Sequence, residues 1–264
     1  MQGQPGSWQK IALLGLGLFA LRSDSLPRID TQIPRMQNLP RLTVWAWERR
    51  EDLRTLDPAT TAVAWLDRTI ILDARGVRVE GRRQPLLLPA SAALVRIPVV
   101  RMETRDSADL SEASAEAAAQ AILGSFDSRA AALQIDFDAR RSERAWYRDV
   151  LTRVRRSLPQ NVPLSITALA SWCSYDNAWI HTLPIDEAVP MFFRMEPDRQ
   201  RASLHGELSS PELTIREPIC SHSAGISTRE RRPAQLAGKR IYIFPDGGWQ
   251  QDDLEETVKQ LWRN

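Results

Sequence analysis

The feature that most constrains the fold is an alternation of strand-like and helix-like segments from residue 92 onward. AALVRIPVVRME (92–103) is a continuous apolar strand pattern, and alanine-rich LSEASAEAAAQAILGSF (110–126) is a helix pattern with a serine near its start. AALQIDFD (131–138) is the next strand pattern, and RAWYRDVLTRVRRSL (144–158) is an amphipathic helix pattern. Strands that alternate with helices and are apolar on both sides predict a parallel sheet covered on both faces.

Further strand patterns extend this rhythm over about 220 residues. They are RLTVWAWER (41–49), TAVAWLD (61–67), a hairpin pattern turning at Gly76 (69–81), PLSITALASW (163–172), AVPMFFRM (188–195) and GKRIYIFPDGGW (238–249), with a closing helix pattern at 251–263. About eight strands predict an α/β fold, a (β/α)8 TIM-barrel-like single domain that is irregular between its second and third strands. A doubly wound open sheet is the alternative, but no glycine-rich phosphate loop follows the first strand.

The N-terminus carries an apolar run at residues 11–21, between Lys10 and Arg22. A membrane-spanning helix needs about 20 apolar residues, so the run is short for a span and has the length of a signal-peptide core. We therefore predict an export signal or short membrane anchor at 1–22, a linker at 23–40, and the barrel domain at 41–264. The predicted location is periplasmic or secreted; a short buried helix is the alternative for 11–21.

Cys173 and Cys220 are the two cysteines of the chain. In an exported protein such a pair can form one disulfide. Neither the cysteines nor the three histidines show metal-ligand spacing, so we predict no metal and no cofactor. The formal net charge of +2 is small beside 35 basic and 33 acidic residues, which argues against a nucleic-acid partner.

The acidic strand LQIDFDAR places Asp136 and Asp138 on the same face, because side chains alternate along a strand. In barrels of this kind the chemistry lies at the C-terminal strand ends, where these two carboxylates would sit. Two like charges this close disfavour each other's ionisation, so a shared proton would make one of them an acid near neutral pH. An Asp–Arg network, with Arg140, Arg141 or Arg194 as the cation, is the alternative reading, and both can hold at once.

Other acids and aromatic residues fall at predicted strand ends. Carboxylates serve proton transfer and aromatic planes serve sugar faces, so the set is typical of a sugar-cleaving site. The catalytic candidates are Asp136, Asp138, Glu103 and Glu196; the substrate-binding candidates are Trp47, Trp172, Arg194, Asp246 and Trp249.

Four segments carry a family resemblance: LQIDFDARRSER, PLSITALASWC, LPIDEAVPMFFRM and CSHSAGIST. From about Trp45 to Trp249 the chain resembles an uncharacterised bacterial family, domain of unknown function 3142, which implies no settled activity. More weakly, it resembles chitinase-like TIM-barrel glycoside hydrolases, which carry Asp-Gly-x-Asp-x-Asp-x-Glu after the fourth strand. Asp136 and Asp138 match the second and third acids of that pattern, whereas Leu133 and Arg140 replace the first aspartate and the glutamate.

These observations predict an exported, glycoside-hydrolase-like barrel that acts on a polysaccharide or oligosaccharide through rim carboxylates. The alternative is a non-catalytic carbohydrate-binding or scaffold barrel in envelope polysaccharide assembly, which needs no substitute for the missing glutamate. An intracellular metabolic enzyme is the third hypothesis, and the N-terminal apolar run and missing cofactor motif count against it. The sequence leaves enzymatic activity, the sugar and its linkage open.

Overall fold

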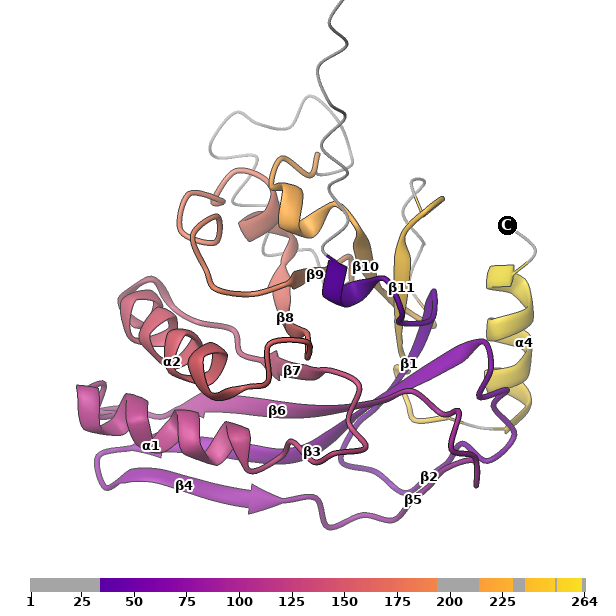
Figure 1. The fold of residues 1–264 in the computed structure, drawn as a ribbon, viewed down its shortest axis with the longest axis horizontal. Helices are drawn as coiled ribbons and strands as arrows, with labels where there is room; N and C mark the ends of the chain where they lie inside the picture. The colour runs from indigo at the N-terminus through magenta and orange to yellow at the C-terminus, as the bar shows by residue number, and fades with distance from the viewer. Residues whose placement is uncertain (1–33, 194–213, 230–235, 250, 263–264) are drawn as a thin grey trace, which may run out of the picture. The chain divides into compact units, whose positions relative to one another are not determined.

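Eight parallel strands close into a barrel. The computed structural model describes residues 34–193, 214–229, 236–249 and 251–262 (Figure 1). The barrel strands are β1 (Leu42–Ala46), β3 (Thr61–Asp73), β6 (Arg96–Thr104), β7 (Leu133–Asp136), β8 (Leu164–Leu169), β9 (Glu187–Met191), β10 (Ser223–Ser227) and β11 (Arg240–Phe244). The barrel closes because β1 pairs in parallel with both β3 and β11. Closure confirms the TIM-barrel-like prediction and rules out the open doubly wound sheet.

The predicted irregularity between the second and third barrel strands is a β-hairpin. β3 continues past the barrel and pairs in antiparallel fashion with β4 (Gly76–Gly81). Gly76 has φ of +108°, a conformation that favours glycine, so the hairpin turns where the sequence predicted. A second, two-stranded sheet joins β2 (Glu51–Asp52) and β5 (Leu86–Leu87).

Two details of the strand prediction were wrong. The patterns at 61–67 and 69–81 begin as one strand, β3, whose register with β6 shifts between Leu66 and Arg68. The charged pair Asp67–Arg68 at this irregularity made one long strand look like two. β10 was not predicted, because SAGIS has small residues and little β-branched or aromatic content.

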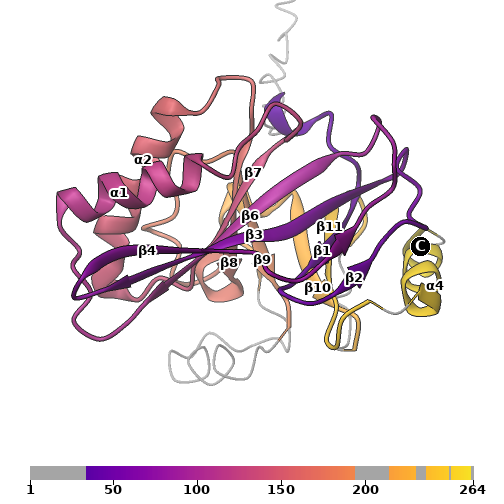
Figure 2. The ribbon, with the colours of Figure 1, turned by 90° about the horizontal axis from the view of Figure 1, so that it is seen from below.

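Helices cover part of the barrel. α1 (Glu112–Leu123) follows β6, α2 (Arg144–Ser157) follows β7, and α4 (Gln251–Trp262) follows β11. α1 and α2 lie side by side, with α1 next to β3 and β4, and α4 lies at the other side of the barrel (Figures 1 and 2). The predicted serine start of α1 is confirmed: the Ser111 side chain accepts a hydrogen bond from the backbone N–H of Ser114 at 3.2 Å. After β1, β3 and β8, the described connections contain no α-helix.

A disulfide joins the connection after β8 to the segment just before β10. Cys173 ends the 3-10 helix η3 (Ala170–Cys173) after β8, and Cys220 ends η4 (Pro218–Cys220) before β10. The two cysteines are bonded, with α-carbons 5.8 Å apart, as predicted. Both are fully buried in a core cluster that also contains α1 and α2 residues.

The barrel interior holds a hydrogen-bonded polar chain rather than apolar side chains alone. Trp45 Nε1 donates to Gln134 Oε1 at 2.9 Å, and Gln134 Nε2 donates to Ser165 Oγ at 3.1 Å. Ser165 and Tyr242 both donate to Glu187 Oε2, at 2.9 and 2.7 Å. All five side chains are buried, so these bonds satisfy polar groups that would otherwise be costly.

The predicted export segment at 1–22 and linker at 23–40 fall mostly outside the described residues. Among the residues that the structure describes, no helix combines the length and apolarity that crossing a membrane requires.

Candidate functional site

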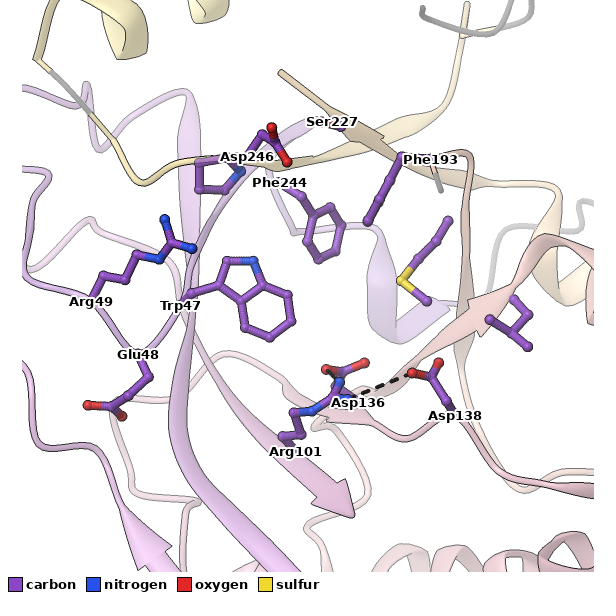
Figure 3. A pocket seen from close by; sticks show the side chains of 13 residues that line it. Trp47, Glu48, Arg49, Arg101, Asp136, Asp138, Phe193, Ser227, Phe244 and Asp246 are labelled. Atoms are coloured by element: carbon purple, nitrogen blue, oxygen red, sulfur yellow. Dashed lines mark hydrogen bonds and ion pairs between the residues drawn. The ribbon is translucent and has the colours of Figure 1, made fainter. Parts of the chain in front are cut away.

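A cavity of about 520 Å³ opens at the C-terminal ends of the barrel strands (Figure 3). Seven of the eight barrel strands, or the residues just after them, contribute to its wall. The lining residues are Trp47, Glu48, Arg49, Arg101, Asp136, Asp138, Leu169, Met191, Phe193, Ser227, Phe244, Pro245 and Asp246. The cavity thus occupies the end of the barrel where the sequence predicted a site.

Asp136 and Asp138 line this cavity but differ in environment. Asp136 ends β7, and its side chain is 3% exposed, whereas that of Asp138, two residues on, is 48% exposed. Thr167 Oγ1 donates to Asp136 Oδ1 at 2.6 Å, and Arg101 Nη1 donates to Asp136 Oδ2 at 2.7 Å. Asp136 is therefore held in place through both oxygens, and Asp138 is the aspartate more open to a ligand.

Arg101 on β6 links three carboxylates. Besides Asp136, its Nε lies 3.2 Å from Glu103 Oε1 and its Nη2 lies 3.8 Å from Asp138 Oδ2. Burial disfavours the charged guanidinium, but Asp136, followed by Asp138 and Glu103, outweighs burial and raises the pKa of Arg101. Arg101 is thus a fixed positive charge that offsets the repulsion between the two aspartates.

Aromatic rings form another part of the wall. The ring centroid of Trp47 lies 4.3 Å from that of buried Trp45 and 6.5 Å from that of Phe244, and Phe193 lies 4.9 Å from Phe244. Gly225 leaves room for this cluster of rings, since a Cβ there would come within 3.1 Å of the Phe244 ring. In Figure 3 the Trp47, Phe193 and Phe244 rings lie across the cavity from Asp136 and Asp138.

The structure brings together some predicted residues and separates others. Asp136, Asp138, Trp47 and Asp246 line the cavity, and Glu103 lies beside it, paired with Arg101. Arg194 and Glu196 lie outside the described residues.

The predicted pocket roles of two tryptophans were wrong. Trp172 is 2% exposed and packs edge-on against Trp179, with ring centroids 4.7 Å apart, because it lies in η3 after the end of β8 and belongs to the core cluster that contains α2 residues. Trp249 is also buried, and its Nε1 donates to the backbone oxygen of Trp45 at 2.8 Å. Neither lines the cavity.

Among the residues that the structure describes, the arginine printed beside the aspartates is Arg101, which was not predicted; the predicted Arg194 lies outside the described residues. Arg140 Nε instead pairs with Glu143 Oε1 at 2.9 Å, and Arg101 takes the place beside Asp136. A signal for Arg101 was present in VVRME, where an arginine interrupts an apolar strand two residues before Glu103 and so shares its face. Thr167 and Phe193 carried no comparable signal.

The arrangement supplies carboxylates, one fixed cation and stacking surfaces in a space of ligand size. Among the described residues, no group of three or more His, Cys, Asp or Glu side chains could hold a metal ion. The chemistry that these residues offer directly is proton transfer by a carboxylate and electrostatic stabilisation of a positive charge.

Comparisons with known proteins add little to this picture. No family model matches the chain, and no curated protein matches it. Among solved structures, the crystal structure of the Bacillus cereus spore cortex-lytic enzyme SleL matches with a TM-score of 0.40 and 13% sequence identity. That match covers 70% of this chain and 50% of the SleL chain. The strand order and closure, rather than this likeness, define the fold.

Proposed function

We propose that the barrel takes a polysaccharide chain into the cavity at its C-terminal end and hydrolyses it through rim carboxylates. The observation that carries the proposal is the placement of Asp136 and Asp138 across one cavity from the rings of Trp47, Phe193 and Phe244 (Figure 3). Sugar rings stack on aromatic faces, and glycosidic bonds are cleaved by carboxylates that transfer protons and stabilise positive charge.

The two aspartates take different roles in this proposal. Asp138 is the proton-transfer group, because it is half exposed and lines the cavity. Asp136 is a positioning residue: it anchors Arg101, which in turn lies 3.8 Å from Asp138. Asp246, which also lines the cavity, is the candidate second carboxylate.

A non-catalytic glycan-binding barrel is the second candidate function. One observation favours it: Arg140 occupies the position of the chitinase-like glutamate and is paired with Glu143. Without a proton donor at that position, the same cavity would hold a sugar chain without cleaving it.

Export belongs to the proposal as well. The Cys173–Cys220 disulfide supports an oxidising compartment, because such bonds are rare in the cytosol of most organisms. The apolar run at 11–21 supports the same location. The resemblance to domain of unknown function 3142 also stays part of the proposal.

The test uses the full chain with a panel of bacterial envelope and extracellular polysaccharides. Sedimentation with insoluble glycans measures binding, and release of reducing ends measures cleavage. Trp47→Leu should weaken binding at least about tenfold, since it removes a stacking face. The control is Leu87→Ala, which truncates an exposed apolar side chain on β5 outside the cavity wall. Binding without cleavage supports the second candidate, and no binding to any glycan overturns both.

A further inference from the structure

The outer side of the β3–β4 hairpin is an open sheet edge. β4 pairs with β3 on one side, and among the residues that the structure describes no strand pairs with its other side (Figure 1). An edge strand presents unpaired N–H and C=O groups, which are a template for pairing with another strand. β4 has no proline, and its register with β3 is unbroken from Arg68↔Gly81 to Asp73↔Gly76, so neither a proline nor a bulge blocks such pairing.

The hydrogen bonds of the hairpin determine which backbone groups face this edge. The N–H of Arg82, just after β4, donates to the backbone oxygen of Asp67 at 2.7 Å. Hydrogen-bonded and non-hydrogen-bonded pairs alternate along an antiparallel ladder, so the even-numbered residues of β4 bond to β3. The odd-numbered residues, Val77, Val79 and Gly81, therefore point their N–H and C=O groups outward. A Cβ at Gly81 would meet nothing within 4 Å, so this edge is open.

The side chains of β4 expose apolar surface on one face and charges on the other. Val79 is 43% exposed, although its register partner on β3, Ile70, is fully buried. On the opposite face, the side chains of Arg78 and Glu80 are 50% and 37% exposed, and their charged ends lie 3.6 Å apart. Glu80 also lies 3.3 Å from Arg83. Ion pairs this exposed contribute little free energy, so both charges are available to a partner.

One antiparallel register of two β4 strands satisfies both the backbone and the charges. If a two-fold axis passes through Val79, Val79 lies opposite itself and Val77 lies opposite Gly81 of the second copy, so the outward backbone groups pair with one another. Between these pairs, Arg78 lies opposite Glu80 of the second copy on both sides of the axis, and opposite charges in this position attract. An axis through Arg78 or Glu80 instead places like charges opposite each other, which is destabilising.

From the open edge, the exposed Val79 and the self-complementary charges, we propose that a second copy of this chain docks on β4. The two β4 strands pair in antiparallel fashion about Val79 and continue the β6–β3–β4 sheet across a two-fold axis. Such an interface uses the same patch on both copies, and VRVE (77–80) supplies a patch that fits itself. Because paired short strands form less than a standard interface, the dimer should be reversible, with a dissociation constant of about 10–100 μM.

The first test removes a backbone donor from the edge. Sedimentation velocity of the full chain over a concentration series measures dimerisation, and circular dichroism checks folding. Val79→Pro deletes an N–H that points away from β3, and proline is tolerated at such a position of an edge strand. The variant should therefore fold, and its dissociation constant should rise at least about tenfold, because the central hydrogen bonds of the dimer are lost.

Charge variants test the register itself. Arg78→Glu and Glu80→Arg each place like charges opposite one another, so each variant should form its own dimer about tenfold more weakly. A mixture of the two variants should dimerise as the unchanged chain does, because each cross-strand pair then joins opposite charges. The double variant Arg78→Glu/Glu80→Arg should do the same. Arg129→Glu is the control, because it reverses one exposed charge outside β4 and should leave the dimer unchanged.

Three results would overturn the proposal. The first is an unchanged chain that stays monomeric up to about 1 mM, far above the expected dissociation constant. The second is a dimer that the β4 variants leave intact, since it would join the chains through another surface. The third is weakening by the single charge variants without recovery in their mixture or in the double variant. If Val79→Pro does not fold, the charge variants alone decide. These measurements involve no glycan, so their outcome is independent of the proposed function.

Discussion

Arg101 Nη1 lies 2.7 Å from Asp136 Oδ2, and the two residues are register partners on the neighbouring parallel strands β6 and β7. This pair answers why the chain keeps two aspartates on one face of β7. The guanidinium compensates the repulsion between Asp136 and Asp138, so a shared proton is not needed for the two to sit together. The predicted Asp–Arg network is thus present at the wall of the cavity, with Arg101 beside Asp136 where Arg140 or Arg141 was predicted.

Asp136→Asn should lower the free energy of unfolding by about 1–3 kcal/mol, because Arg101 loses its shortest ion pair while Asn can still accept from Thr167. Urea unfolding measures the change. Adding Arg101→Gln should recover part of the loss, since the double variant no longer holds a guanidinium beside a neutral side chain, and the Asp138 and Glu103 carboxylates that also lose Arg101 are about half exposed. Arg101→Gln alone completes the comparison. If the loss of unfolding free energy in the double variant equals the sum of the losses in the two single variants, the pair is not coupled.

Removing the disulfide should destabilise the protein by about 4 kcal/mol, from the loop-entropy estimate for a 47-residue separation. Thermal unfolding with and without reductant measures it. The chain holds two cysteines, so a reductant acts on this bond alone. The Cys173→Ala/Cys220→Ala double variant should match the reduced protein and show no response to reductant. A response in that variant would mean that reductant acts by another route.

Two buried tyrosines should respond differently to loss of the hydroxyl. Tyr147 Oη is buried with no hydrogen-bond partner among the described residues, whereas Tyr242 donates to Glu187. Tyr147→Phe should therefore be neutral or stabilising, and Tyr242→Phe should cost about 1–2 kcal/mol. Urea unfolding of both variants near neutral pH compares them, and equal losses would contradict the assignment.

Alkaline pH should destabilise the protein through the same two tyrosines. Burial, followed for Tyr147 by Asp136 and for Tyr242 by Glu187, raises the pKa of both tyrosines well above the ordinary value. Their protonated forms are favoured in the folded state, so stability is full below about pH 10 and falls as pH rises above it. Tyr147→Phe should reduce this fall in a series of unfolding curves, and an unchanged pH dependence would contradict it.

The barrel was predictable because its signals are local. Continuous apolar runs such as LTVWA in β1 and the hydrophobic face of α2 report burial directly. The hairpin at Gly76 and the Cys173–Cys220 bond were predictable for the same reason, from one turn residue and one pair of cysteines.

The site was predictable only in part, because its contacts join distant segments. Asp136 and Asp138 stood out as acids in an apolar strand, but their partner Arg101 lies 35 residues from Asp136 and meets it only through strand register. The prediction for Trp172 was wrong because the strand pattern does not reveal that β8 ends at Leu169 and that a 3-10 helix follows. β10 was not predicted because its residues are small, and one of them, Gly225, makes room for Phe244.

Asp138→Asn should leave the fold intact and lower glycan hydrolysis at least about 100-fold, if the barrel is an enzyme. The fold should survive because this side chain is 48% exposed and its Arg101 contact is the longest of the three. Hydrolysis should fail because Asn keeps the shape of Asp138 but cannot transfer a proton.

Glu103→Gln is the matched comparison for this variant. Glu103 is exposed to a similar extent, at 46%, and pairs with the same guanidinium, yet it does not line the cavity. Glu103→Gln should lower the rate of hydrolysis by less than about threefold, because it removes at most one exposed ion pair and such pairs contribute little free energy. Reducing-end release, with circular dichroism to check folding, measures both variants side by side. If the Glu103 variant loses hydrolysis and the Asp138 variant keeps it, the proton-transfer group lies beside the cavity rather than in its wall, and the role given to Asp138 is wrong.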